Sequence, residues 1–203
     1  MHQERLPHLH PTVWSSFKSG DKEAYALLYE TYFSRLYNYG YKFTKDQLLV
    51  EDAIQDLFVK LWQHRESLGC PASVTNYLYK SLRGILFNKL TRGDAAFQHP
   101  ANLEDYRFEV VPSPEADLIQ SRLADDRREQ LAKALAALTP RQREAIFLKF
   151  YEGLSYEEVA DIMAVTVKAV YKITARALVT LKSSLTKMAA LYLAAILLFP
   201  FFR

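Results

Sequence analysis

The chain has 203 residues, of which 50% are apolar and 13% aromatic, so a packed core is available and global disorder is excluded. Its single cysteine, Cys70, excludes an intrachain disulfide, and its net charge of +3 says little until the charges are located along the chain. The N-terminal residues lack the apolar run of a signal peptide, which together with the lone thiol predicts a cytoplasmic protein. His8 and His10 by themselves make no metal site, so we expect neither a metal nor a cofactor.

Two helices are predicted in the first third of the chain, and no alternating β pattern is present anywhere. The first covers about residues 21–42, after an Asp21 cap, because its large side chains recur at steps of three and four. These side chains are Tyr25, Leu28, Tyr32, Leu36 and Tyr39. The second covers about residues 47–65, after a capping-box candidate at 44–47. Its predicted buried residues are Ile54, Leu57, Phe58, Leu61 and Trp62.

A third helix, over about residues 75–91, follows a loop at 66–74 that is marked by Gly-Cys-Pro. Gly84 lies inside this helix and is expected to weaken it slightly. Residues 92–116 contain three prolines and no clear period, which predicts an extended linker. A further helix is expected to start near Pro114.

Residues 138–182 predict a helix-turn-helix. Capping boxes begin at Thr139 and Ser155, and Thr166 can cap a third helix that runs from Val167 to about Ser183. The short turn Ala164-Val165 separates the last two helices. In this arrangement the second helix of the pair enters the major groove of DNA.

Basic residues cluster in two blocks of the sequence. Residues 166–187 contain five basic residues and no acid, and Lys168, Lys172 and Arg176 share one face of the predicted helix. A plain solvated helix would show Glu partners at four-residue steps, and none are present. Residues 67–93 also lack acids, whereas residues 94–129 hold nine acids against four arginines. This pattern predicts two nucleic-acid contacts joined by an acidic segment.

The last segment, residues 188–202, is almost purely apolar. It is shorter than the roughly 20 residues of a spanning helix, and Pro200 shortens its helix further. We expect a final helix that packs on the rest of the chain or on a partner, rather than a membrane contact.

Three blocks of the sequence resemble one family. They are LYNYGYKF at the end of the first helix, EDAIQDLFVKLW at residues 51–62, and the helix-turn-helix at residues 138–178. In these blocks the chain resembles the bacterial sigma-70-type RNA polymerase sigma factors of the extracytoplasmic-function (ECF) group. The resemblance implies an all-α fold with two small helical domains joined by a flexible linker. The implied divisions are an N-terminal arm (1–20), a region 2-like domain (21–93), an acidic linker (94–128), a region 4-like domain (129–187) and an apolar tail (188–203).

The resemblance also implies partners and sites. Such proteins bind core RNA polymerase, recognise promoter DNA and help to open it, commonly under control of an anti-sigma factor from the membrane, and no small-molecule substrate is implied. The implied polymerase-binding residues are Asp52, Gln55 and Asp56. The implied minus-ten residues are Tyr77, Tyr79, Lys80, Arg83, Lys89 and Arg92, of which Tyr79, Lys80 and Arg83 are expected to be exposed. The implied minus-thirty-five residues are Thr166, Lys168, Ala169, Lys172 and Arg176.

The chain departs from the family pattern at three positions. Gly84 and Tyr77 stand where many members have Asn and Trp, and Ala164 replaces the usual turn glycine, so the turn must form without a residue that tolerates positive φ at low cost.

A conventional helix-turn-helix regulator that does not bind polymerase explains residues 138–182 equally well, but it leaves EDAIQDLFVKLW unexplained. An enzyme is not expected, because no phosphate-binding loop, HExxH, GxSxG or Cys–His pairing is present.

Overall fold

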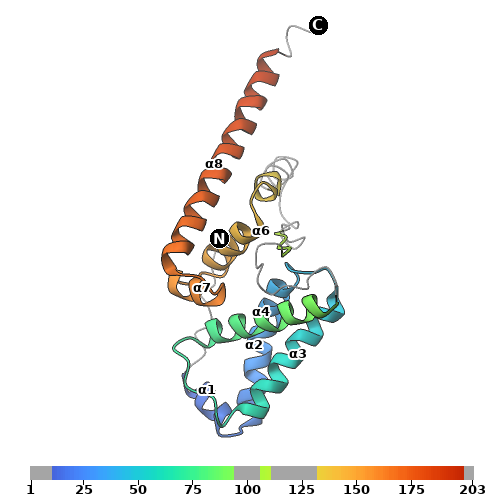
Figure 1. Ribbon diagram of the computed structural model, residues 1–203, viewed down its shortest axis with the longest axis vertical. Coiled ribbons are helices and arrows are strands. Elements are labelled where there is room, and N and C mark those ends of the chain that lie inside the picture. The colour runs from blue at the N-terminus through green and yellow to red at the C-terminus, as the bar shows by residue number, and fades with distance from the viewer. Residues whose placement is uncertain (1–10, 94–105, 111–131, 199–203) are drawn as a thin grey trace.

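The computed structural model describes residues 11–93, 106–110 and 132–198, and every helix in these ranges belongs to one of two lobes (Figure 1). The N-terminal lobe contains α1 (Pro11–Lys18), α2 (Lys22–Gly40), α3 (Gln47–His64) and α4 (Val74–Gly93). The C-terminal lobe contains a short helical turn at 132–136, α6 (Pro140–Ile146), a π-helical turn (Phe147–Tyr151), α7 (Tyr156–Ile162) and α8 (Val167–Leu198). No strand occurs in the described residues, so the predicted all-α class is confirmed.

The N-terminal lobe is built around α2, α3 and α4. The predicted Asp21 cap is confirmed, since its carboxylate accepts the backbone N–H groups of Glu23 and Ala24. The cap of α3 differs from the prediction, because Asp46 rather than Thr44 accepts the N–H of Leu49. Thr44 instead accepts the N–H of Asp46 in the preceding turn.

Helices α2 and α3 approach each other closely at Gly40. A Cβ atom at this position would lie 2.8 Å from Cγ1 of Val50. The predicted apolar stripe of α3 is confirmed at four of its five positions, and Trp62 is only half-buried. Glycine at position 40 therefore lets the two helices meet along that stripe.

Residues 11–18, which the sequence assigns to an N-terminal arm, form helix α1. Trp14 and Phe17 bury their rings against the N-terminal lobe, and Trp14 Nε1 donates a hydrogen bond of 3.1 Å to the carbonyl of Gly69. This contact ties α1 to the loop that precedes α4.

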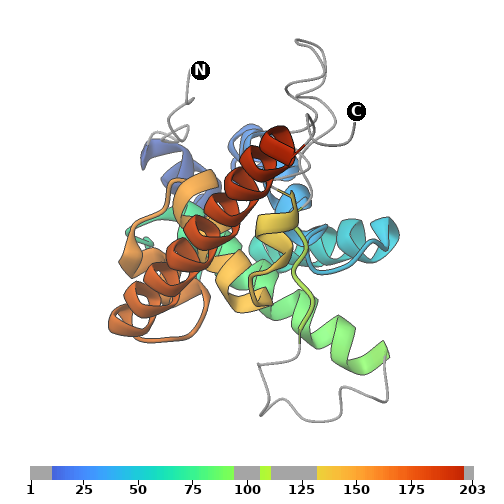
Figure 2. The ribbon, with the colours of Figure 1, turned by 90° about the horizontal axis from the view of Figure 1, so that it is seen from above.

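The C-terminal lobe forms the predicted helix-turn-helix. Both capping boxes are present, with Thr139 and Gln142 at α6 and Ser155 and Glu158 at α7. Ala164 adopts a φ of 53°, the left-handed conformation that its turn requires. Helix α8 extends well beyond the predicted end at Ser183 and continues to Leu198, projecting away from both lobes (Figures 1 and 2). None of the helices in the described ranges is long and apolar enough to cross a membrane.

A short piece of the predicted linker packs between the two lobes. Residues 106–110, here called the strap, are extended as expected, but Tyr106 and Phe108 are buried in the common core. The N–H of Glu109 donates a 2.8 Å hydrogen bond to the carbonyl of Lys42, and Nη1 of Arg143 donates one of 2.9 Å to the carbonyl of Phe108. The strap thus contacts both lobes at once.

Candidate nucleic-acid and polymerase interfaces

The first turns of α8 present a basic face to solvent. Lys168, Lys172 and Arg176 are exposed, whereas Val170, Thr174 and Ala177 on the opposite side are buried. Thr166 caps the helix by accepting the N–H of Ala169 at 3.2 Å, as predicted. No ion pair among the described residues involves the three cations. This face can therefore meet phosphates and base edges without first releasing an internal carboxylate.

The turn before α8 is supported by aromatic packing. Tyr156, at the start of α7, stacks on Tyr171 with ring centroids 4.0 Å apart. Lys149 extends over the ring of Tyr156, with its Nζ 4.5 Å from the ring centroid, and donates a hydrogen bond to the carbonyl of Leu154. These contacts hold α7 and α8 at the fixed angle that a helix-turn-helix needs.

The predicted polymerase-binding residues lie together on the solvent side of α3. Asp52 and Asp56 are one helical turn apart, and Gln55 lies exposed between them. Lys89, from α4, forms ion pairs with both carboxylates and lies 2.7 Å from Oδ2 of Asp56. The hydrogen bonds that Lys89 donates to Asp52 and then to Asp56 raise the pKa of Lys89 above its ordinary value. Lys89 therefore shares a site with the polymerase-binding candidates, although the sequence grouped it with the minus-ten residues.

The predicted minus-ten residues do not form one exposed surface. Tyr79 is fully buried and Arg83 is 6% exposed, so the expectation that both are exposed is wrong in this conformation. The physical reason is the helical period, because Tyr79 follows Leu78 and precedes Leu82 and Leu86 on the buried side of α4. Lys80 is exposed, as expected. Tyr77 is half-buried with its ring edge against Trp14, and the side chain of Arg92 lies outside the described set.

Arg83 is buried because it pairs with a carboxylate that the sequence did not single out. Glu144, on α6, is completely buried, and its Oε1 lies 2.8 Å from Nε of Arg83. The hydroxyl of Tyr39 donates to the same oxygen at 2.7 Å, and the hydroxyl of Tyr106 donates to Oε2. Burial, followed by the negative charge of Glu144, raises the pKa of both tyrosines, which therefore stay protonated as donors.

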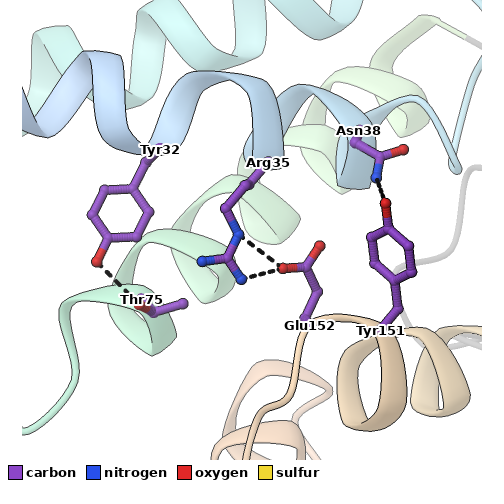
Figure 3. Close-up of polar contacts among 6 residues, drawn as sticks. All are labelled: Tyr32, Arg35, Asn38, Thr75, Tyr151 and Glu152. Atoms are coloured by element: carbon purple, nitrogen blue, oxygen red, sulfur yellow. Dashed lines mark hydrogen bonds and ion pairs between the residues drawn. The ribbon is translucent and has the colours of Figure 1, made fainter. Parts of the chain in front are cut away.

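A second ion pair joins α2 to the end of the π-helical turn (Figure 3). Arg35 donates through Nε and Nη2 to Oε2 of Glu152, whose side chain is almost fully buried. Close by, Asn38 Nδ2 lies 3.5 Å from the hydroxyl of Tyr151 (Figure 3). The hydroxyls of Tyr32 and Thr75 form a hydrogen bond within the N-terminal lobe. The π-helical turn is a local deviation of the kind often found at functional positions, and here it is followed at once by Glu152.

A third contact links α4 to α7. Lys80 Nζ lies 2.6 Å from Oδ1 of Asp161, and Asn76 Nδ2 donates to Oδ2 at 2.9 Å. The hydrogen bond from Lys80, and then that from Asn76, lower the pKa of Asp161. Both partners of the ion pair are about half exposed, so it is weak by itself.

Comparisons with known proteins agree with this arrangement. Two family models match, the "Sigma-70 region 2" model over residues 28–95 and the "Sigma-70, region 4" model over residues 128–181. The ECF RNA polymerase sigma factor SigK of Mycolicibacterium vanbaalenii is 30% identical over 71% of this chain and 72% of its own length. The RNA polymerase sigma factor YlaC of Bacillus subtilis is 26% identical over 79% of this chain and 91% of its own length.

Solved structures support the fold. CnrH, in complex with the cytosolic domain of CnrY, matches with a TM-score of 0.58 at 21% identity over 87% of this chain and 97% of that one. The sigma factor RpoE of Bartonella quintana, in complex with the anti-sigma factor NepR, matches with the same TM-score and identity over 81% and 98%. The family models, the relatives and the helix-turn-helix with its basic face lead to one conclusion: the chain belongs to the sigma-70 family as an ECF sigma factor, a transcription initiation factor and not an enzyme.

Proposed function

We propose that the chain binds core RNA polymerase in the cytoplasm through Asp52, Gln55 and Asp56, and that α8 recognises the minus-thirty-five element. The observation that carries this proposal is the pairing of two different surfaces on one chain. One is an acidic cluster on α3, and the other is a basic face on α8 with no acidic partner among the described residues. A regulator that only binds operators has no use for the first surface.

The division of labour follows the two lobes. The region 2-like domain, residues 21–93, is proposed to bind polymerase and the minus-ten element, through the loop at 66–74 and α4. The region 4-like domain, residues 129–187, is proposed to bind the minus-thirty-five element. On α8, Lys168 and Lys172 are near enough to the helix start to reach guanine edges, and Arg176 lies farther along, where a phosphate contact is expected. Thr166 and Ala169 flank them at the start of the helix.

The minus-ten surface needs aromatic faces and cations, because opened bases regain about 1–3 kcal/mol each by stacking on an aromatic ring. Tyr77 and Lys80 are at least partly exposed to solvent, although Lys80 pairs with Asp161, whereas Tyr79 is buried and Arg83 is paired with Glu144 of the C-terminal lobe. An anti-sigma factor is the expected inhibitor, since both solved relatives named above are held in complexes with one, or with the cytosolic domain of a second protein.

Run-off transcription with purified core polymerase tests the proposal. The templates are genomic fragments, including the region upstream of the gene that encodes this chain. Discrete transcripts that require the chain, and that vanish in the Asp52→Lys/Asp56→Lys variant, are the expected result. Glu51→Lys, which reverses a charge on the same helix outside the proposed contact, is the matched control and is expected to retain activity. DNA binding without polymerase binding or transcripts would identify a conventional helix-turn-helix regulator instead.

A further inference from the structure

The two lobes share one apolar core instead of meeting at a polar surface. The Tyr39 ring of the N-terminal lobe stacks on Phe147 of the C-terminal lobe, with centroids 6.1 Å apart and planes 16° from parallel. Phe108 of the strap packs against both rings, with its centroid 6.0 Å from that of Tyr39 and 5.8 Å from that of Phe147. These three rings come from both lobes and the strap and are removed from water together. Their burial favours a closed arrangement, in which the two lobes are in contact.

The ion pairs between the lobes all have the same polarity within the part of the chain that the structure describes. In each of them the cation comes from the N-terminal lobe and the carboxylate comes from the C-terminal lobe. The pairs are Arg35–Glu152, Lys80–Asp161 and Arg83–Glu144. A buried carboxylate such as Glu144 is costly unless a cation pairs with it. Because its cation, Arg83, belongs to the other lobe, this ion pair favours the arrangement in which the lobes are in contact.

Two of these cations, Lys80 and Arg83, are the ones that the proposed function assigns to promoter DNA. Asp161 and Glu144 already accept from the donor groups of Lys80 and Arg83 that a DNA phosphate would need. A carboxylate and a phosphate compete for the same guanidinium or ammonium group, because both present oxygen acceptors with negative charge. The closed arrangement therefore masks part of the minus-ten surface with the chain's own acids, while the basic face of α8 remains exposed.

We propose that the three ion pairs and the strap form a self-masking lock, which keeps the free sigma factor closed and is released when the lobes separate for promoter binding. This inference rests on the proposed function only in its second part, because closure of the free protein can be measured by itself. The strap bridges the two lobes in this lock, since the Tyr106 hydroxyl donates a hydrogen bond to Glu144 of the C-terminal lobe, and the backbone N–H of Glu109 donates one to the carbonyl of Lys42 in the N-terminal lobe.

The first test measures closure of the free chain. Dyes on the native Cys70 and on a Val179→Cys substitution, both exposed and in different lobes, report the distance between the lobes by single-molecule energy transfer. The wild type is expected to give a dominant high-efficiency population with a small low-efficiency fraction, and Glu144→Gln is expected to increase that low-efficiency fraction at least ten-fold. Tyr32→Phe, which removes a buried hydrogen bond inside the N-terminal lobe, is the control and should leave the distribution unchanged. Equal distributions for wild type and Glu144→Gln would overturn the lock.

The second test fixes the lock shut. In a Cys70→Ser background, Asn76→Cys and Asp161→Cys place one thiol on each side of the α4–α7 contact. A short, reducible bismaleimide is expected to join them and to lower run-off transcription at least ten-fold, with recovery on reduction. The single Asp161→Cys variant, treated in the same way, is expected to keep its activity. Unimpaired transcription by the joined protein would refute masking. If the reduced protein also gives no transcript, the proposed function fails, and the energy-transfer measurement still decides whether the lock exists.

Discussion

Lys89 Nζ lies 2.7 Å from Oδ2 of Asp56 and also pairs with Asp52, so one ammonium group bridges both carboxylates of the α3 cluster and offsets one of their two negative charges. The two carboxylates remain about half exposed, whereas the lysine is only 24% exposed. An approaching basic surface would therefore meet an acidic cluster whose charge is reduced from within the same lobe.

Removing this amine should change the rate of polymerase binding. Lys89→Gln is expected to speed association with core polymerase a few-fold at low salt, because uncompensated charge at an interface acts mainly on the association rate. Stopped-flow fluorescence at two salt concentrations measures the effect. Lys22→Gln, at an exposed residue at the start of α2 in the same lobe, is the control. Slower association by Lys89→Gln would show instead that Lys89 orients the carboxylates for binding.

The basic residues of α8 should separate into two classes. Lys172→Ala is expected to cost about 1–3 kcal/mol on the cognate minus-thirty-five sequence and less on other sequences, since a base contact carries the discrimination. Arg176→Ala is expected to weaken binding to all sequences alike and to lower the salt slope by about 1, as a phosphate contact does. Fluorescence anisotropy with cognate and scrambled duplexes checks both. Equal losses on both duplexes for Lys172→Ala would remove its assignment to a base.

Two glycines of the N-terminal lobe should respond to alanine in opposite directions. Gly84 lies exposed within α4, and a Cβ there would have no neighbour within 4 Å. Gly84→Ala is therefore expected to raise the free energy of unfolding by about 0.5–1 kcal/mol, because alanine has the higher helix propensity. Gly40→Ala should lower it, since its Cβ would meet Val50 at 2.8 Å. Urea denaturation measures both, and destabilisation by Gly84→Ala would indicate a packing role for that glycine.

Acid should weaken the α4–α7 contact through Asp161. The pKa of Asp161 is lowered in the folded protein, so its contribution to closure is complete above its unfolded pKa of about 3.9 and is lost as the pH falls through the lower folded value. Energy transfer between the lobes, followed from pH 7 to acid, is expected to differ between wild type and Asp161→Asn at neutral pH. The two curves should converge in acid, where protonated Asp161 resembles asparagine. Parallel curves at every pH would exclude this carboxylate as a source of closure.

Local signals in the sequence predicted much of this fold. The caps at Asp21, Thr139, Ser155 and Thr166 and the apolar stripe of α3 depend on residues within a few positions of one another, where helical spacing is informative. Helix α1 escaped prediction because its short sequence lacks a clear cap and its two buried rings pack on distant segments.

The interdomain contacts could not be predicted in the same way. Glu144 and Arg83 are 61 residues apart, and nothing near Glu144 distinguishes it from a solvated acid in the first turns of a helix. The burial of Tyr79 was within reach of the sequence, because its spacing from Leu82 and Leu86 places it on an apolar face of α4.

Helix α8 joins DNA recognition to a point far from the DNA. Its 32 residues correspond to a length of about 48 Å, and the recognition residues occupy only its first turns. Because a continuous α-helix curves only gently, its distal end must turn whenever the recognition residues change their angle in the groove. A protein that binds this end could therefore set the angle at which α8 enters the major groove, without contacting the DNA or a recognition residue. Such a protein would change which promoters the sigma factor prefers.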